Sequence, residues 1–140
     1  MRRYPFWIAL GITVFCSASC GPKVVYCDVS GTVTYNGKPP NDVGCSITFL
    51  SADGKDVTTS IAPTGEYLAK NVVSGPNKVA VYYSNPEAAK PRPPGEKAPK
   101  STSPLRNLPF EYADPKTSKL TVDVTQGTVF NVEMKGPVLK

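Results

Sequence analysis

Few side chains in this sequence could perform covalent or acid–base chemistry. The chain contains four cysteines and no histidine. Histidine is the usual general base of serine and cysteine hydrolases, so its absence excludes Ser–His–Asp and Cys–His catalysis. Zinc would need cysteine or carboxylate ligands, and no Cys-x-x-Cys pair is present to supply them. We therefore expect no enzyme activity, no metal site and no cofactor.

Cys20 is the cysteine with the clearest predicted chemistry, because of the segment that precedes it. Residues 1–3 carry positive charge, residues 6–16 are apolar and uncharged, and small residues follow. This order is typical of a cleaved secretory signal. The apolar run has eleven residues. As a helix it would rise only about 16 Å, which is too short to cross a hydrocarbon core of roughly 30 Å.

Residues 17–21, with the sequence SASCG, resemble the lipobox of bacterial lipoproteins. The resemblance implies that residues 1–19 are a lipoprotein signal peptide and that Cys20 is acylated, with palmitate among the acyl chains. Several acyl chains hold a protein firmly on a membrane. Gly21, in place of aspartate, implies sorting to the outer membrane. Ser17 departs from the usual leucine, and the alternative is ordinary cleavage at this place, which releases a soluble secreted protein.

The rest of the chain is long enough for one domain. We expect residues 20–23 to form a short tether, residues 24–136 a domain and residues 137–140 a tail. Apolar residues alternate with polar ones between turn signals, and no segment has a helical period. Seven short strands of this kind predict an all-β sandwich of two packed sheets. The expected strands are 24–35, 43–51, 57–62, 66–70, 77–84, 120–125 and 130–135.

Residues 86–109 interrupt this pattern with seven prolines. Five lysines and arginines against two glutamates give the segment a charge of +3, and the rest of the mature chain has nine basic and nine acidic residues. A nucleic-acid binder would place such charge on a folded face with aromatic rings, so we expect no nucleic-acid partner. The composition predicts a mobile or polyproline II loop, with a contact site as the alternative.

Several turn motifs follow one another in a specific order along the sequence. Together they resemble the carboxypeptidase regulatory-like domain, a transthyretin-like (prealbumin-like) β-sandwich found in many small bacterial lipoproteins. The resemblance implies a seven-stranded transthyretin-like sandwich over about residues 24–135. The motifs that carry it are 29–39 (VSGTVTYNGKP), 47–49 (ITF), 62–67 (APTGEY), 71–76 (NVVSGP), 78–81 (KVAV) and 112–118 (YADPKTS).

These motifs have structural explanations. Gly31 provides a point without a side chain, which allows a bulge or a close approach to the first strand. Asn36-Gly37 favours a hairpin, and Gly65 permits a turn. Transthyretin-like enzymes that hydrolyse 5-hydroxyisourate depend on histidines and on a C-terminal Tyr-Arg-Gly-Ser, and this chain has neither. The resemblance therefore implies a scaffold and not an enzyme.

Cys27 and Cys45 are the other cysteines of the predicted mature chain, and both have the parity of an inward-facing strand position. An oxidising compartment and an even count favour a disulfide between them. Closing a loop of about 18 residues would stabilise the fold by about 3 kcal/mol. The alternative is two buried free thiols that pack as small apolar groups.

Two hypotheses of function follow. The first is a non-enzymatic, lipid-anchored protein of the cell envelope, facing the periplasm or the cell surface, that acts as a structural or protein-interaction module with an envelope partner. The second is an extracytoplasmic module that binds a carbohydrate or small molecule. Such a module needs a concave aromatic site. Tyr82, Phe110 and Tyr112 are the candidate ligand surface.

Overall fold

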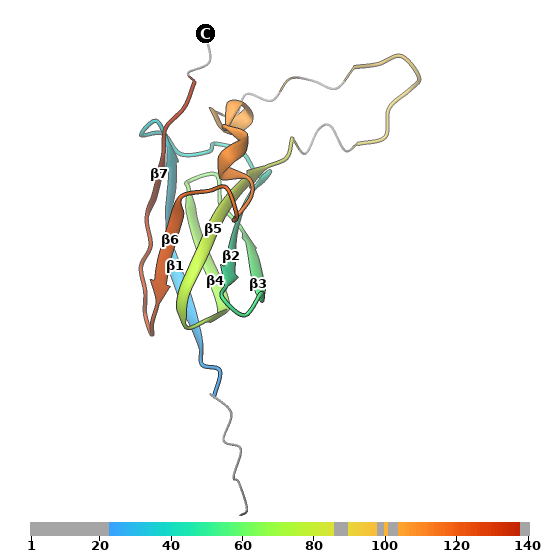
Figure 1. The fold of residues 1–140 in the computed structure, drawn as a ribbon. Coiled ribbons are helices and arrows are strands. Elements are labelled where there is room, and N and C mark those ends of the chain that lie inside the picture. Colours follow the sequence, from blue (N-terminus) through green and yellow to red (C-terminus); the bar gives the residue numbers. More distant parts are fainter. Residues whose placement is uncertain (1–22, 86–89, 98–99, 101–103, 138–140) are drawn as a thin grey trace, which may run out of the picture.

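The computed structural model describes residues 23–85, 90–97, 100 and 104–137. Within these ranges the chain is all-β and forms seven strands and two short 3-10 helices (Figure 1). The predicted signal peptide 1–19, Cys20 and residues 138–140 of the predicted tail lie outside the described residues. The elements are β1 (Tyr26–Tyr35), β2 (Cys45–Ser51), β3 (Asp56–Ser60), β4 (Glu66–Val73), β5 (Gly75–Tyr83), η2 (Pro104–Asn107), η3 (Phe110–Tyr112), β6 (Leu120–Val124) and β7 (Val132–Met134).

The described strands form two sheets, one of three strands in the order β4-β1-β7 and one of four in the order β3-β2-β5-β6. The pairs are antiparallel except for β1 and β7, which run parallel. Two parallel strands cannot be joined by a tight hairpin. β7 is far from β1 in the sequence, and the chain enters β7 from β6, which belongs to the other sheet. The prediction of seven strands in an all-β, β-sandwich-like fold is confirmed. In the described ranges no helix is long and apolar enough to cross a bilayer.

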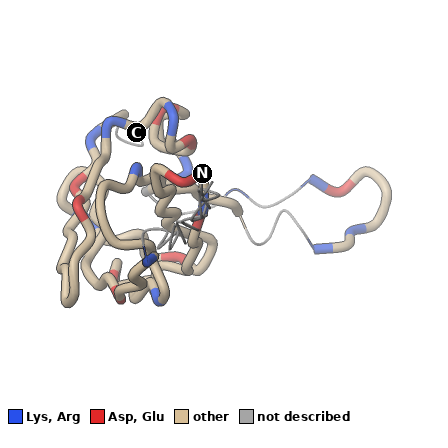
Figure 2. The backbone as a smooth tube through the Cα atoms, turned by 60° about the horizontal axis from the view of Figure 1, so that its bottom comes forward, with Lys and Arg blue, Asp and Glu red and all other residues tan. Residues whose placement is uncertain are grey.

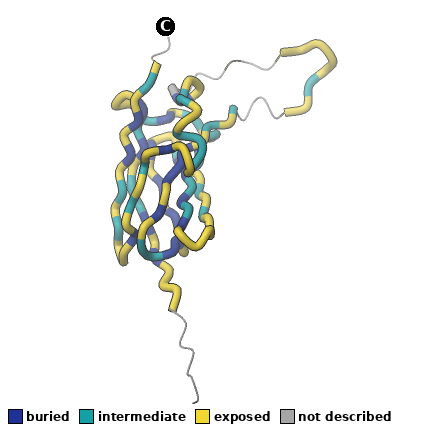
Figure 3. The backbone as a smooth tube through the Cα atoms, in the orientation of Figure 1, coloured by how far each residue is buried: buried dark blue, intermediate teal, exposed yellow. Residues whose placement is uncertain are grey.

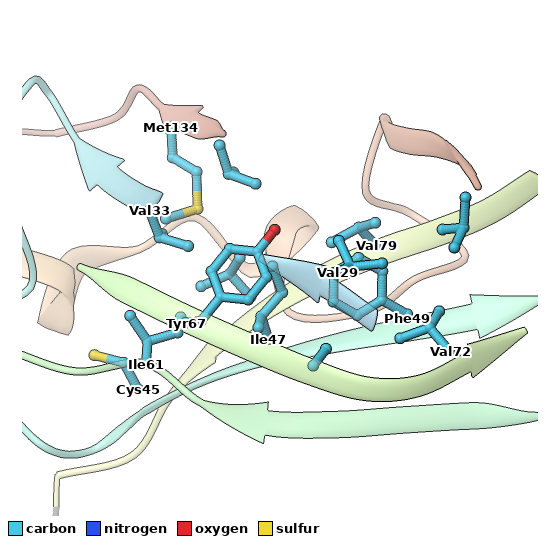
Figure 4. Packing of buried hydrophobic residues seen from close by; sticks show 14 of the residues in the cluster. Val29, Val33, Cys45, Ile47, Phe49, Ile61, Tyr67, Val72, Val79 and Met134 are labelled. Atoms are coloured by element: carbon cyan, nitrogen blue, oxygen red, sulfur yellow. The ribbon is translucent and has the colours of Figure 1, made fainter. Parts of the chain in front are cut away.

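The core lies between the two sheets because each strand turns its apolar positions to one side. In β2, residues 45, 47, 49 and 51 are buried and the residues between them are only half-buried. The same alternation in β1 and β5 directs valines at the opposite sheet. Figure 3 shows the buried positions along the strands of the two sheets. Figure 4 shows the Tyr67 side chain in the apolar cluster with Val33 and Ile47. Burial of these side chains is the main force that holds the sheets together.

The outer limits of several strands differ from the predicted ones. Val25 and Val43 have the same parity as Cys27 and Cys45, the predicted inward-facing positions, but their exposed fractions are 52% and 67%. Both lie before the first cross-strand pairs of their strands, Tyr26 with Val73 and Cys45 with Tyr83. The alternation therefore continues in the sequence beyond the point where the opposite sheet can cover it.

Strand β4 runs to Val73, three residues beyond the predicted end. Its pairing with β1 contains a register shift between Cys27 and Val29. Asn71 lies in this stretch with φ 59°, and its N–H donates to the Asp28 carboxylate at 3.2 Å. Asparagine tolerates this left-handed conformation better than most residues. The register shift places an extra residue of β4 opposite β1, and the pairing then continues to Val73.

The predicted loop 86–109 is shorter in the structure, because residues 104–109 belong to the folded domain. Leu105, on η2, is 1% exposed and packs in the core. The Tyr35 hydroxyl lies 3.3 Å from the carbonyl oxygen of Asn107, which ties η2 to β1. Residues 90–97 extend away from the sandwich (Figure 1). Two leucines, Leu105 and Leu108, between prolines carry no periodic signal, so the sequence did not reveal this anchor.

The predicted role of Gly31 is confirmed as a close approach. A Cβ at this position would collide with the carbonyl oxygen of Phe130, on the segment that leads into β7. That carbonyl also accepts a hydrogen bond of 2.6 Å from the Tyr67 hydroxyl. The backbone of residues 128–130 thus lies directly against β1, and a glycine is what permits this distance.

Candidate functional site

The N-terminal end of the sandwich is where the predicted lipid anchor would enter. The first described residue is Lys23, and Val25 accepts a backbone hydrogen bond of 2.9 Å from Ser74 in the β4–β5 turn. The Lys55 ammonium lies 3.1 Å from the Tyr26 hydroxyl and 5.5 Å from the centre of its ring. The turns β2–β3 and β4–β5 therefore surround the entry of the chain, and Cys20 lies three residues before the first described one.

The predicted disulfide between Cys27 and Cys45 is not formed in this structure, where both are buried free cysteines. Cys27 pairs with Val72 near the start of β1, and Cys45 pairs with Tyr83 at the start of β2. The start of β1 lies near the end of β2, far from Cys45. Tyr26 pairs with Val73, whose carbonyl accepts a 2.8 Å hydrogen bond from the Asn77 side chain. Asn77 in turn pairs with Ser51, the last residue of β2. The two cysteines thus lie at opposite ends of the sandwich, which a disulfide cannot bridge.

The Cys45 thiol is held in its neutral form. Burial, and secondarily the nearby Asp42 carboxylate, raises the pKa of Cys45 to about 12. A thiol with such a pKa is almost wholly protonated at neutral pH, and the thiolate is the reactive form. Cys45 is 2% exposed and packs in the core as a neutral thiol.

The three aromatic residues proposed as a ligand surface do not behave alike. Tyr82, on the outward side of β5, is 52% exposed, and Phe110, on η3, is 87% exposed. Tyr112 is half-buried against the core, and its hydroxyl lies 3.5 Å from the carbonyl oxygen of Lys135. Within the described part of the chain no ring contact joins any two of these side chains. An exposed aromatic surface would therefore depend on Tyr82 and Phe110.

Two buried tyrosine hydroxyls bond to backbone instead of facing a ligand. The Tyr35 hydroxyl donates to the carbonyl of Pro137 at 2.9 Å, and that of Tyr67 donates to the carbonyl of Phe130. Burial raises the pKa of Tyr67, and burial together with the Tyr112 phenol raises the pKa of Tyr35. These hydroxyls stay protonated and join β1 and β4 to the C-terminal segment.

A hollow at the seam between edge strands β3 and β4 has a volume of about 680 Å³ and a largely apolar lining that includes Ile61, Tyr67 and Leu68. The Thr59 hydroxyl donates to the carbonyl of Leu68 at 3.1 Å across the seam. This bond joins the two sheets at their shared edge. The lining of this hollow has one charged residue, Glu66, and no pattern in the sequence predicted the hollow.

A second hollow, of about 490 Å³, lies at the opposite end of the sandwich from Tyr26 and is called the root hollow below. It is lined by two cations, Lys100 and Arg106, together with Tyr83, Asn85 and Asn107. The Tyr83 hydroxyl donates to the Asp42 carboxylate at 2.8 Å. The sequence signal for this site was the positive charge of residues 86–109, although the lining itself comes from segments that only folding brings together.

The described part of the chain is thus a small all-β protein with two sheets, a largely apolar hollow at the β3–β4 seam and a cation-lined hollow at one end. No protein-family model matches the chain, and no curated protein matches it. A solved structure similar to it is the crystal structure of a DUF3823 family protein from Bacteroides ovatus, with a TM-score of 0.43 and 14% sequence identity. The match covers 78% of this chain and 44% of that chain, so this chain spans less than half of the longer protein.

Proposed function

We propose that this protein is a non-enzymatic, lipid-anchored module of the cell envelope that acts by contact with an envelope partner. The lipobox-like sequence around Cys20 is the observation that supports the proposal. The first strand begins only six residues after Cys20, at Tyr26. The intervening chain can span at most about 20 Å when extended. An acylated Cys20 would hold the N-terminal end of the sandwich close to a membrane, and Gly21 favours the outer membrane.

The chemistry of the buried groups supports a scaffold. Tyr35, Cys45 and Tyr67 have raised pKa values, and in each the main cause is burial. A raised pKa keeps these groups neutral at physiological pH, the opposite of what an activated nucleophile requires. The two tyrosine hydroxyls are also engaged with backbone carbonyls. We further propose that the sandwich is transthyretin-like, because Gly31 and Tyr67 of the resembling motifs have structural roles.

Metabolic labelling with a palmitate analogue tests the anchor. The wild-type protein should be labelled and should sediment with membranes, and Cys20→Ala should abolish both. Cys16→Ala is the matched control, because it removes the neighbouring cysteine of the predicted signal and should leave labelling intact. An unlabelled wild type, or labelling that persists in Cys20→Ala, would refute the proposal.

The alternative function is a carbohydrate- or small-molecule-binding module, and the exposure of Tyr82 and Phe110 is the observation that favours it. Exposed aromatic rings can stack on sugars or other flat apolar groups. A glycan array distinguishes the two functions. If Tyr82→Ala folds normally but loses a glycan that the wild type binds, while Tyr26→Ala keeps it, the binding-module hypothesis replaces the scaffold.

A further inference from the structure

The most strongly charged feature of the described chain is a basic arm, defined here as residues 90–97. It carries Lys90, Arg92 and Lys97 against one acidic residue, Glu96. Figure 2 shows these charged residues standing away from the rest of the chain. Because the predicted mature chain is neutral outside residues 86–109, its net charge is concentrated in and around this arm.

The tip of the arm has a defined turn. The Glu96 N–H donates to the carbonyl of Pro93 at 3.2 Å, and Gly95 has φ +95°. Proline at the second position and glycine with positive φ at the third are the features of a type II β-turn. Prolines at 91, 93 and 94 also limit the backbone freedom of the arm. Arg92 and Lys97 therefore flank a preorganised turn, which lowers the entropy lost when the arm binds a partner.

The root hollow continues the positive charge from the arm to the surface of the sandwich. Its lining adds the basic residues Lys100 and Arg106, and the neutral residues Asn85 and Asn107 also line it. The guanidinium of arginine is a planar donor that can hold a carboxylate or a phosphate with two parallel hydrogen bonds. Arm and hollow together contain five basic residues, which is more than one small anion needs.

The arm leaves the sandwich at the end remote from the proposed anchor. It follows Tyr83, which pairs with Cys45, whereas Tyr26 begins β1 at the other end. Figure 1 shows the described N-terminal residues and the arm at opposite ends of the domain. A protein tethered through Cys20 would thus present the arm away from its own membrane. This direction rests on the proposed function, whereas the charge and the turn do not.

We propose that the arm and the root hollow bind an anionic polymer of the cell envelope, whose repeating groups are phosphates or carboxylates. A polymer presents several anions in sequence, so individually weak contacts with Lys90, Arg92, Lys97, Lys100 and Arg106 act together. Such binding is largely electrostatic and weakens as salt rises. The lipid would hold the protein at one end while the arm holds the polymer at the other.

Fluorescence anisotropy of labelled polyphosphate and labelled polyglutamate, each titrated with the purified full chain in detergent, tests the proposal. The wild type should bind at least one polymer, with an affinity that falls between about 50 and about 200 mM salt. Comparison of the two polymers shows which anionic group is preferred. Lipid labelling of the same preparation is measured separately, so failure of the anchor and failure of the arm are distinguishable.

The matched variants neutralise two cations each. Arg92→Gln with Lys97→Gln should weaken binding about 10- to 30-fold, since each basic residue near an anionic surface contributes roughly a fivefold factor. Lys70→Gln with Lys78→Gln removes the same charge from exposed positions on the sheets and should change binding less than about twofold. Gly95→Val keeps every charge but strains the turn, and it should weaken binding by a few fold.

Three results would overturn the binding proposal, and a fourth would refute only the role of the turn. Equal losses in the two double variants would show a response to net charge and not a site. Absence of binding to both polymers would remove the partner. Tighter binding to vesicles of anionic lipid than to either polymer, lost in the arm variant, would assign the arm to a membrane surface. Unchanged binding by Gly95→Val would refute the role of the preorganised turn.

Discussion

Replacing Gly31 with alanine should loosen the packing between β1 and the segment that leads into β7. An added Cβ would collide with the Phe130 carbonyl oxygen and lie 3.0 Å from the Tyr67 hydroxyl. Gly31 is not among the glycines with positive φ, so alanine is compatible with its backbone conformation. The whole effect should therefore come from the contact.

The magnitude follows from the bonds that hold residues 128–130 in place. The Ser30 N–H donates to Thr128 at 3.2 Å, and the Ser30 carbonyl accepts from Phe130 at 2.8 Å. The Tyr67 hydroxyl adds its bond of 2.6 Å. Weakened hydrogen bonds cost about 1 kcal/mol each, and overpacking costs about 1–3 kcal/mol. We expect the free energy of unfolding to fall by about 2–4 kcal/mol, with a Tm lower by roughly 8–16 °C.

Urea denaturation followed by circular dichroism measures this loss. Gly37→Ala is the control, because Gly37 has φ 75° and open space around it, so only backbone strain of about 1 kcal/mol should appear. In a double-mutant cycle, Tyr67→Phe should cost less in Gly31→Ala than in the wild type, because the Phe130 carbonyl has already moved. A loss below about 0.5 kcal/mol, or strict additivity with Tyr67→Phe, would refute the reasoning.

Three further predictions concern the buried residues. Leu105→Ala should destabilise the protein by about 2–4 kcal/mol in urea denaturation, whereas Phe110→Ala on the surface should change stability by less than about 0.5 kcal/mol; equal effects would contradict the role of η2 in the core. Unfolded, unreduced protein should react with Ellman's reagent at both Cys27 and Cys45, and a lack of reaction would indicate a disulfide. Because the pKa of Cys45 is raised from 9.0 to about 12, the unfolded chain loses this proton first, so stability should be full below pH 9 and fall as pH rises toward 12. Cys45→Val should flatten the unfolding free energy between pH 9 and pH 10, before tyrosine ionisation contributes, and an identical slope in the variant would count against burial as the cause.

The alternation of apolar and polar residues predicted the strands correctly wherever one face of a strand is buried and the other face is not. Ile47 and Phe49 in β2, with Thr48 between them, follow this rule, and so do Val79 and Val81 in β5. The pattern could not show where the opposite sheet stops, so Val25 and Val43 continue the inward parity of their strands although both are exposed. Local sequence reports periodicity, whereas burial depends on the extent of a partner.

The candidate sites show the same division. Positive charge and proline content marked residues 86–109. The root hollow forms only when folding brings Tyr83 and Arg106 together. Leu105 is buried only because η2 packs against core residues that are distant in the sequence. Tyr82, Phe110 and Tyr112 do not form one exposed aromatic surface, because Tyr112 packs against the core whereas Phe110 is exposed. Parity predicts which way a strand residue points, but Phe110 and Tyr112 lie on a 3-10 helix, where parity does not apply.

The sequence by itself predicts an export signal and a lipobox-like segment at Cys20, both outside the described residues, and it indicated the seven strands and a close approach at Gly31. These are local properties, set by residue type and spacing. Tertiary structure alone decided that β7 pairs in parallel with β1, that Cys27 and Cys45 lie at opposite ends, and that the basic arm projects from the end remote from Tyr26. The two cysteines lie far apart because β1 and β2 run in opposite directions in facing sheets, and each cysteine lies near the start of its strand. Equal inward parity therefore says nothing about distance along the core.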